Sequence, residues 1–323
     1  MDFNLDETQQ DLRKLAAEVL AKEDGERLWQ AGLMSVCAPE EAGGAGLGPV
    51  EMAVVLREVG ARAAPVPALP TLVSTLTLAH YGTLDQQRRL SSGATVALRE
   101  PGRALADPPL TAARTVDGGW ALTGRKVSVP YPEVPVLIGA DEGLFLVGSP
   151  PATPEYTSTG EPAATIVLDG TPAERVAGPE AVTGARRLFM AAVAAQASGV
   201  LAGALELTTG YVRTRKQFGR ALAEFQAVTM QIADVYIAAR ALDVAMWSAV
   251  WRLGEGLPAD QDLALAAYHV SEAFTALYTC QHLHGGLGLD VTYPLHRYFA
   301  QAKHLSHLLG GADAQLDLIG ALV

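Results

Sequence analysis

Apolar residues downstream of Phe225 recur every three or four positions, at Phe225, Val228, Ile232, Val235, Ala239, Leu242, Met246 and Ala249. This spacing puts them on one face of a long α-helix that packs in a bundle. Residues 199–212 carry the same kind of pattern. The sequence therefore predicts two long helices joined at residues 215–225, with the polar side chains of the junction facing outward.

The first 93 residues predict an all-helical unit. Asp6 and Glu7 open a first helix, and Glu26 to Leu33 forms a second. Further helices are expected over 51–61, 71–81 and 83–90. The glycine-rich stretch 38–48 lacks the Lys and Ser/Thr of a phosphate-binding P-loop and follows no strand, so it is interpreted as a turn.

The pattern changes after Gly93. Short apolar or β-branched runs punctuated by Gly, Pro and Asp predict a small antiparallel sheet, at 95–98, 120–124, 134–138, 144–147 and 165–168. Long helical patterns return from Gly184 to the end. The predicted fold is mainly α with a small β domain, divided into a helical domain (1–93), a β domain (94–179) and a helical bundle (180–323).

The composition is that of a water-soluble globular chain. Of its 323 residues 49% are hydrophobic and 18% charged, and the net charge of -11 argues against a nucleic-acid or anionic-membrane partner. Only Cys37 and Cys280 are present, which indicates no disulfide framework and fits a reducing compartment. The acidic N-terminus does not resemble a signal peptide, and the apolar run 188–207 contains Gln196 and many small residues. We therefore expect a cytoplasmic protein with no membrane-spanning helix.

Two polar blocks stand out in the C-terminal region. The first is Arg215-Lys216-Gln217-Phe218-Gly219-Arg220, followed by Phe225-Gln226. An arginine at such a junction presents a planar fork of donors that suits a phosphate or a carboxylate, although a surface salt bridge is the simpler alternative. The second block runs from Gln281 to Gly288 and is followed by residues 292–298.

Together the two blocks resemble the C-terminal domain of the acyl-CoA dehydrogenases, in which R-x-x-F-G...F/H-Q and Q-x-x-G-G-x-G motifs hold the ADP half of FAD. The turn at 39–46 is similar to a P-E-x-x-G-G-x-G turn between N-terminal helices of that family. The resemblance implies the acyl-CoA dehydrogenase fold, with an N-terminal helical domain, a middle antiparallel β domain and a C-terminal four-helix bundle. It also implies FAD as cofactor and cofactor-binding roles for Arg215, Gln217, Phe218, Gln226, Gln281, Gly285 and Gly286.

The family's catalytic base has no counterpart in this chain. In the family, a carboxylate removes the α-proton of an acyl-CoA while the β-hydrogen leaves as hydride to the flavin. One of its two known positions falls at Leu309, or at Gly310 if the register slips, and the other at Phe189. No catalytic residue is therefore assigned.

The segments that hold the flavin ring in the family are also altered. Arg99-Glu100-Pro101 occupies the position of the family's Thr-Glu-Pro-like segment, and residues 126–129 occupy that of its Trp-Ile-Ser/Thr segment. The Trp is gone, and residues 312–314 have lost the family's Thr-Ser-Gln trio.

Histidines cluster near the C-terminus, at His282, His284, His296, His304 and His307. No Cys or carboxylate completes a set of metal ligands around His282 and His284, so no metal is predicted. His304 or His307 as a substitute base is an alternative, against the simpler interpretation of surface or interface histidines.

The family's residues that are missing from this chain share one function, and those that are retained share another. Groups that would hold the flavin ring and perform the chemistry are missing, while groups that would reach a neighbour's FAD are retained. The chain thus resembles the short, non-catalytic subunit of the heteromeric acyl-CoA dehydrogenases of actinobacteria, which act on CoA thioesters of cholesterol or other steroid side chains. The resemblance implies a longer homologous partner that supplies the catalytic Glu, an α2β2 heterotetramer, an acyl-CoA substrate and an electron-transfer flavoprotein as acceptor.

Three alternatives remain at this point. The chain could be a homo-oligomeric acyl-CoA dehydrogenase with an unrecognised base, or a flavin oxidase acting on a nitroalkane-like substrate. It could also be a flavin-free scaffold.

Overall fold

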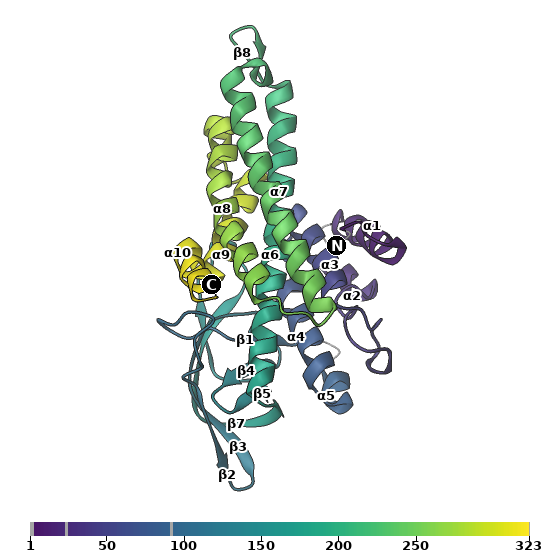
Figure 1. Cartoon of the computed structure of the whole chain (residues 1–323), viewed down its shortest axis with the longest axis vertical. Helices are drawn as coiled ribbons and strands as arrows, with labels where there is room; N and C mark the ends of the chain where they lie inside the picture. The colour runs from purple at the N-terminus through teal and green to yellow at the C-terminus, as the bar shows by residue number, and fades with distance from the viewer. Residues whose placement is uncertain (1–2, 23–24, 91–92, 323) are drawn as a thin grey trace. The chain divides into compact units, whose positions relative to one another are not determined.

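The computed structural model describes residues 3–22, 25–90 and 93–322. Its N-terminal part is helical, as predicted (Figure 1). The first helix begins after Asp6, whose carboxylate accepts a hydrogen bond from Gln9 N while the Gln9 side chain accepts one from Asp6 N. The glycine-rich stretch forms a 3₁₀ turn, η1 (Glu40–Ala42), that ends at Gly43 with a φ of 87°. The helices of this part are α1 (Glu7–Leu20), α2 (Glu26–Gln30), α3 (Pro49–Ala61), α4 (Ala68–Tyr81) and α5 (Leu84–Arg89).

The middle of the chain forms a seven-stranded sheet in the order β1-β4-β5-β7-β3-β2, with β6 paired to β7. The predicted all-antiparallel sheet is wrong at one edge, because β1 pairs in parallel with β4. The sequence also missed β2 and β6, whose residues are mostly exposed and lack an apolar run. The strands are β1 (Thr95–Ala97), β2 (Ala112–Val116), β3 (Gly119–Pro130), β4 (Val136–Ala140), β5 (Gly143–Val147), β6 (Ala152–Glu155) and β7 (Ala163–Ala177).

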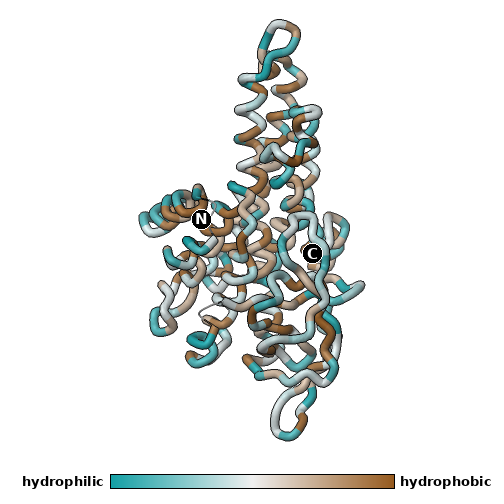
Figure 2. Tube along the Cα trace, turned by 180° about the vertical axis from the view of Figure 1, so that it is seen from behind, coloured by the Kyte–Doolittle hydropathy of each residue, from teal (hydrophilic) through white to brown (hydrophobic). Residues whose placement is uncertain are grey.

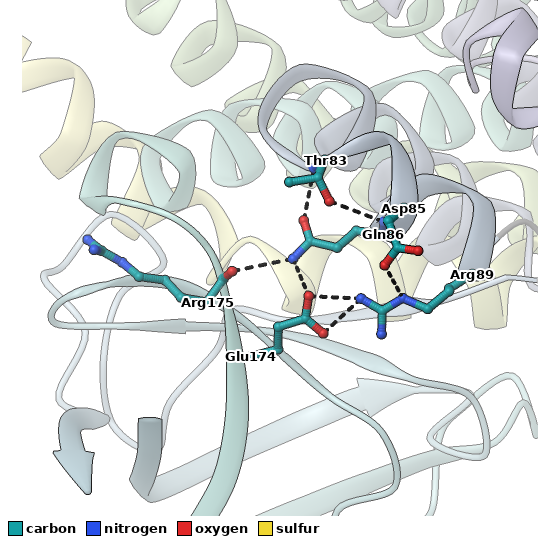
Figure 3. Close-up of polar contacts among 6 residues, drawn as sticks. All are labelled: Thr83, Asp85, Gln86, Arg89, Glu174 and Arg175. Carbon is teal, nitrogen blue, oxygen red and sulfur yellow. Dashed lines mark hydrogen bonds and ion pairs between the residues drawn. The ribbon is translucent and has the colours of Figure 1, made fainter. Parts of the chain in front are cut away.

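A polar cluster attaches α5 to β7 (Figure 3). Glu174 Oε1 and Oε2 both accept from Arg89 Nη2, at 2.8 Å each, and Glu174 Oε1 also accepts from Gln86 Nε2 at 2.7 Å. Gln86 also closes the capping box of α5, because its side-chain oxygen accepts from Thr83 N at 2.9 Å. The start of α5 and its contact with the sheet therefore depend on the same glutamine.

The C-terminal part is helical again, as predicted, and its two longest helices form an antiparallel pair. Figure 1 shows this pair with β8 at its tip, and Figure 2 shows hydrophobic and hydrophilic residues alternating along its length. The junction between the pair is a short β-hairpin with a 3₁₀ turn rather than a simple helix-to-helix connection. The elements are α6 (Pro179–Thr214), β8 (Lys216–Gln217), β9 (Arg220–Ala221), η2 (Leu222–Glu224), α7 (Gln226–Gly254), α8 (Asp260–His284), η3 (Gly285–Leu289), α9 (Leu295–Leu308) and α10 (Gly311–Leu322).

Helix α6 is a core helix. Of the helices in the described part of the chain, it alone is long and apolar enough to cross a membrane, but 89% of its most apolar stretch is buried inside the structure. Its glycines let α3 approach closely. A Cβ at Gly199 would overlap the carbonyl oxygen of Arg57, and one at Gly203 would overlap that of Ala61. The small residues that weakened a membrane interpretation therefore serve helix packing.

The described chain divides into two compact units. One comprises the described parts of residues 1–23, 53–64 and 193–323, and the other those of 24–52 and 65–192. Helices α3 and α6 each contribute residues to both units. The three-domain division at 1–93, 94–179 and 180–323 follows the order of elements along the chain and stays a prediction.

Candidate cofactor-binding site

The hairpin at the end of α6 holds the first polar block. Gln217 pairs with Arg220, so Phe218 and Gly219 are the two central residues of the turn. Both have positive φ, 54° and 82°, as a type I′ hairpin requires. A positive φ is unfavourable for a phenylalanine, yet Phe218 adopts it with its side chain 91% exposed. The hairpin thus presents an aromatic ring and its neighbours to the outside.

The hairpin is strongly basic, although the whole chain has a net charge of -11. The side chain of Arg215 is exposed and forms no ion pair with any residue that the structure describes, so the salt-bridge alternative finds no partner here. The guanidinium of Arg220 lies over the ring of Phe225, 3.9 Å from its centroid. Exposed groups in and beside the hairpin can donate to a ligand: the cations Arg213, Arg215, Lys216 and Arg220 and the amides of Gln217 and Gln226.

The second block forms the end of α8 and the short helix η3. Gly285 turns the chain with φ 59° and ψ -137°, a conformation that a residue with a Cβ rarely adopts. No atom lies within 4 Å of the place where a Cβ would stand on Gly285 or on Gly286. The backbone of this loop is therefore open to the close approach of a ligand.

Gln281 braces this loop from within the chain. Its side-chain Nε2 donates to the carbonyl of Gly288 at 3.2 Å, and a Cβ on Gly288 would stand 2.6 Å from the Gln281 carbonyl oxygen. Gln281 also stands four residues before Gly285, whereas the pattern Q-x-x-G-G places its Gln three residues before the first glycine. The residue at that position is His282, which is exposed. It was not among the residues predicted to bind FAD, although counting back from Gly285 identifies it.

An aromatic stack joins the two blocks. The rings of Tyr211 and His284 lie parallel within 21°, with centroids 4.3 Å apart, and Tyr293 contacts His284 from a third segment at 5.3 Å. Tyr211 lies one helical turn before Arg215, and His284 directly precedes Gly285. Nothing local in the sequence indicates that Tyr211, His284 and Tyr293 meet, so this stack was not predicted.

The residues of the two blocks fit the ADP half of FAD. A pyrophosphate needs cationic and amide donors together with backbone that it can approach closely. Arg215 and Gln217 supply the donors, and Gly285 and Gly286 supply the open backbone. The assignment of all seven residues to FAD stays a prediction.

Both positions of the family's catalytic base are filled by buried apolar side chains. Leu309 follows α9 and is 2% exposed, and Phe189 lies on α6 and is 4% exposed. The alternative base His307 is exposed on α9 rather than enclosed in a site. Among the described residues there is no group of three or more His, Cys, Asp or Glu side chains that could bind a metal.

The altered segments of the β domain are bonded to each other. Val127 N donates to the carbonyl of Arg99 at 3.1 Å, and the buried Lys126 ammonium donates to Glu100 Oε1 at 2.6 Å. Thr111 donates to the same oxygen through its backbone N and its hydroxyl. Burial alone would raise the pKa of Glu100, but the hydrogen bonds from Lys126 and Thr111 outweigh it and lower the pKa to about 2. The Glu100 that survives from the family pattern is therefore fully engaged inside the chain.

Comparison with known proteins places these features in one family. The model described as acyl-CoA dehydrogenase, C-terminal domain, matches residues 186–323, and that of the N-terminal domain matches residues 6–95. Acyl-CoA dehydrogenase FadE28 of Mycobacterium tuberculosis is 40% identical to this chain, over 99% of the chain and 98% of the relative.

Two solved structures are similar over nearly their whole length. The Tcur3481-Tcur3483 steroid ACAD G363A variant matches with a TM-score of 0.91 and 37% identity, over 98% of this chain and 97% of that one. The crystal structure of the ChsE4-ChsE5 complex from Mycobacterium tuberculosis matches with a TM-score of 0.92 and 32% identity, over 99% and 98%.

Proposed function

Because the chain belongs to the acyl-CoA dehydrogenase family, we propose that it is one subunit of a heteromeric, FAD-dependent acyl-CoA dehydrogenase that acts on a steroid-derived CoA thioester. The observation that carries the proposal is a contrast within the chain. Two blocks suited to the ADP half of FAD are retained and joined by the Tyr211–His284 stack, while buried apolar residues fill both positions of the catalytic base. Such a chain completes a partner's site rather than one of its own.

FAD is the cofactor of this family, and when bound it supplies the acceptor for the hydride that leaves the acyl chain. In the proposed assembly, Arg215 and Gln217 donate to the pyrophosphate, and Gly285 and Gly286 let it approach the backbone. Phe218, Gln226 and Gln281 complete the contacts, Gln281 by holding the loop in shape. All of these groups lie on one compact unit of this chain.

A longer homologue supplies the carboxylate that removes the α-proton and the pocket for the flavin ring. Support comes from the two similar structures: one is a complex of two chains, ChsE4 and ChsE5, and the other is a steroid ACAD whose name pairs Tcur3481 with Tcur3483. We extend this to an α2β2 heterotetramer located in the cytoplasm, with an electron-transfer flavoprotein as electron acceptor. The steroid class of the substrate comes from these relatives.

The homo-oligomeric alternative is less well supported, because it needs a base that neither Leu309 nor Phe189 can provide. The nitroalkane oxidase alternative needs a carboxylate near Leu309 and fails for the same reason. A flavin-free scaffold would leave the exposed donors of the hairpin without a role.

The proposal is tested by producing the chain alone and together with a longer homologue from the same genome. The chain alone should hold little FAD and should not reduce an electron acceptor with any acyl-CoA. The complex should be active and carry one FAD per heterodimer, measured as flavin absorbance against protein mass. Turnover by the pure single chain, or two flavins per heterodimer, would contradict the division of labour.

A further inference from the structure

His284 occupies a buried position between two aromatic rings. It is 3% exposed, with Tyr211 of α6 on one side and Tyr293, from the segment after η3, on the other. Its Nδ1 lies 2.8 Å from the carbonyl oxygen of Cys280, one turn earlier in α8. Because a carbonyl can only accept, Nδ1 carries the hydrogen, and Nε2 is the unprotonated nitrogen of a neutral ring.

The Nε2 atom is buried and has no hydrogen-bond partner among the residues that the structure describes. A proton added to it would create a charged ring whose second N–H donates to nothing, which is costly in a buried site. The titratable side chains that contact the ring are the phenols of Tyr211 and Tyr293, and the thiol of Cys280 belongs to the residue whose carbonyl faces Nδ1. None of them is a carboxylate that would stabilise an imidazolium.

The ring connects directly to the loop assigned to FAD. His284 is the last residue of α8, and its stack on Tyr211 is the aromatic contact between that loop and the helix that leads to Arg215. Loss of the stack would leave the loop held by the Gln281–Gly288 hydrogen bond, because no atom lies within 4 Å of the Cβ position on the open side of Gly285.

We propose that His284 is a positioning residue for FAD, which in its neutral form holds the Gly285–Gly286 loop against α6 and on protonation releases it. This inference rests on the proposed function for the ligand, but it concerns a residue outside the seven assigned to the cofactor. It predicts that FAD affinity falls at acid pH through this chain.

The direction of the pH effect follows from the environment of the ring. Burial lowers the pKa of His284 below its ordinary value, and the hydrogen bond to the Cys280 carbonyl offsets part of this. Since the folded protein binds this proton less readily than the unfolded chain, the stabilisation is complete above the ordinary histidine pKa of about 6.5 and is lost as pH falls below it.

The test uses the complex with the longer homologue, titrated with FAD at pH 8, 6 and 5. The dissociation constant of the unaltered complex should rise by up to about tenfold for each pH unit below the pKa of His284. The variant His284→Phe keeps a flat ring between the two tyrosines, but this ring cannot be protonated. The part of the pH dependence of FAD affinity that comes from His284 should therefore be absent in this variant. His269→Phe removes a histidine elsewhere on α8, fifteen positions before His284, and should keep the original pH profile.

A second measurement does not depend on FAD. Backbone hydrogen exchange at residues 285–289, corrected for the intrinsic pH dependence of exchange, should show loop protection that is lost as His284 is protonated in the unaltered chain and is kept in His284→Phe. His284→Gln gives a second side chain without a titrating ring, in case the phenylalanine disturbs folding. The inference would be overturned if loop protection and FAD affinity depended on pH in His284→Phe and His284→Gln in the same way as in the unaltered protein. If the complex binds no FAD at any pH, the proposed function fails, and the exchange data still decide the role of His284.

Discussion

Single cations in this chain have opposite environments. Arg215 is exposed and forms no ion pair with any described residue, whereas the Lys126 side chain is 1% exposed and contacts Glu100 at 2.6 Å. An exposed cation without a partner contributes little to folding and is available to a ligand, whereas a buried one must be paired to be tolerated. The two residues therefore lead to different predictions.

Arg215→Ala should weaken FAD binding to the complex by about 10-fold to 150-fold, because a charge-assisted hydrogen bond contributes roughly 1.5 to 3 kcal/mol. Arg213→Ala removes the same charge two residues earlier and is the matched control, with a smaller expected loss. Titration of FAD into the apo complex measures both. Unchanged flavin affinity in a well-folded Arg215→Ala complex would remove the role proposed for this residue.

Lys126→Met should destabilise the chain by about 3–5 kcal/mol at pH 7, because it leaves the Glu100 carboxylate buried without its cation. The pKa of Glu100 is lowered to about 2, below its ordinary value of 4.5. The stabilisation from Glu100 is therefore complete above pH 4.5 and is lost as pH falls toward 2. Denaturant unfolding measures the free energy of unfolding of both proteins at pH 7 and pH 4. The difference between the variant and the parent should be smaller at pH 4. An equal difference at both would contradict the charged pair.

At the scale of elements, the crossing of α3 and α6 is set by glycine. A Cβ at Gly60 would overlap the Gln196 carbonyl oxygen, and the opposite helix is equally close at Gly199. The end of α3 is held by α9, where the Tyr298 hydroxyl donates to the Ala61 carbonyl at 2.8 Å. The carbonyls that a helix C-terminus leaves without intrahelical partners are thus satisfied by a neighbouring helix.

Gly199→Ala should destabilise the chain by about 1–3 kcal/mol or more, since the two backbones must separate to admit the methyl group. Gly210→Ala is a matched control on the same helix, because no atom lies within 4 Å of its Cβ position. It should be neutral or stabilise by about 0.5–1 kcal/mol, as expected when alanine replaces an exposed helical glycine. Thermal unfolding of the two variants compares them directly, and equal effects would argue against the close crossing.

At the scale of the whole molecule, α7 carries an exposed apolar row at Met230, Ile237 and Val244, spaced by seven residues and 47–64% exposed. Apolar rows of this kind are usually covered in an assembly. We expect the longer homologue to cover this one, which would place the partner beside the basic hairpin at the start of the same helix.

Ile237→Lys should weaken association with the partner while leaving the chain folded, because a charge would be buried in the apolar contact. Val116→Lys changes an exposed aliphatic residue of β2, 54% exposed, and should leave assembly unchanged. Analytical size-exclusion of co-expressed proteins gives the result. A complex of unchanged stability with Ile237→Lys would place the partner on another surface.

Local patterns in the sequence predict most of the helices and strands and the resemblance to one family. The long C-terminal helices follow from apolar spacing over many turns, and that spacing is a local property of the chain. The two polar blocks, and the apolar residues Leu309 and Phe189 at the positions of the catalytic base, can likewise be identified from the sequence. Strands β2 and β6 were not predicted, because their residues are largely exposed and an exposed edge strand has no apolar pattern to detect.

Which distant residues meet depends on how the elements pack. The parallel pairing of β1 with β4, the stack of Tyr211 on His284 and the Lys126–Glu100 pair each join segments separated by 26 or more residues. The hydrogen bond from Gln281 to Gly288 joins residues only seven apart, but it too forms only because the chain turns at Gly285. Helix and strand periodicity fixes where a side chain points relative to its own element. What lies opposite it depends on how the elements pack, and packing is a property of the whole chain.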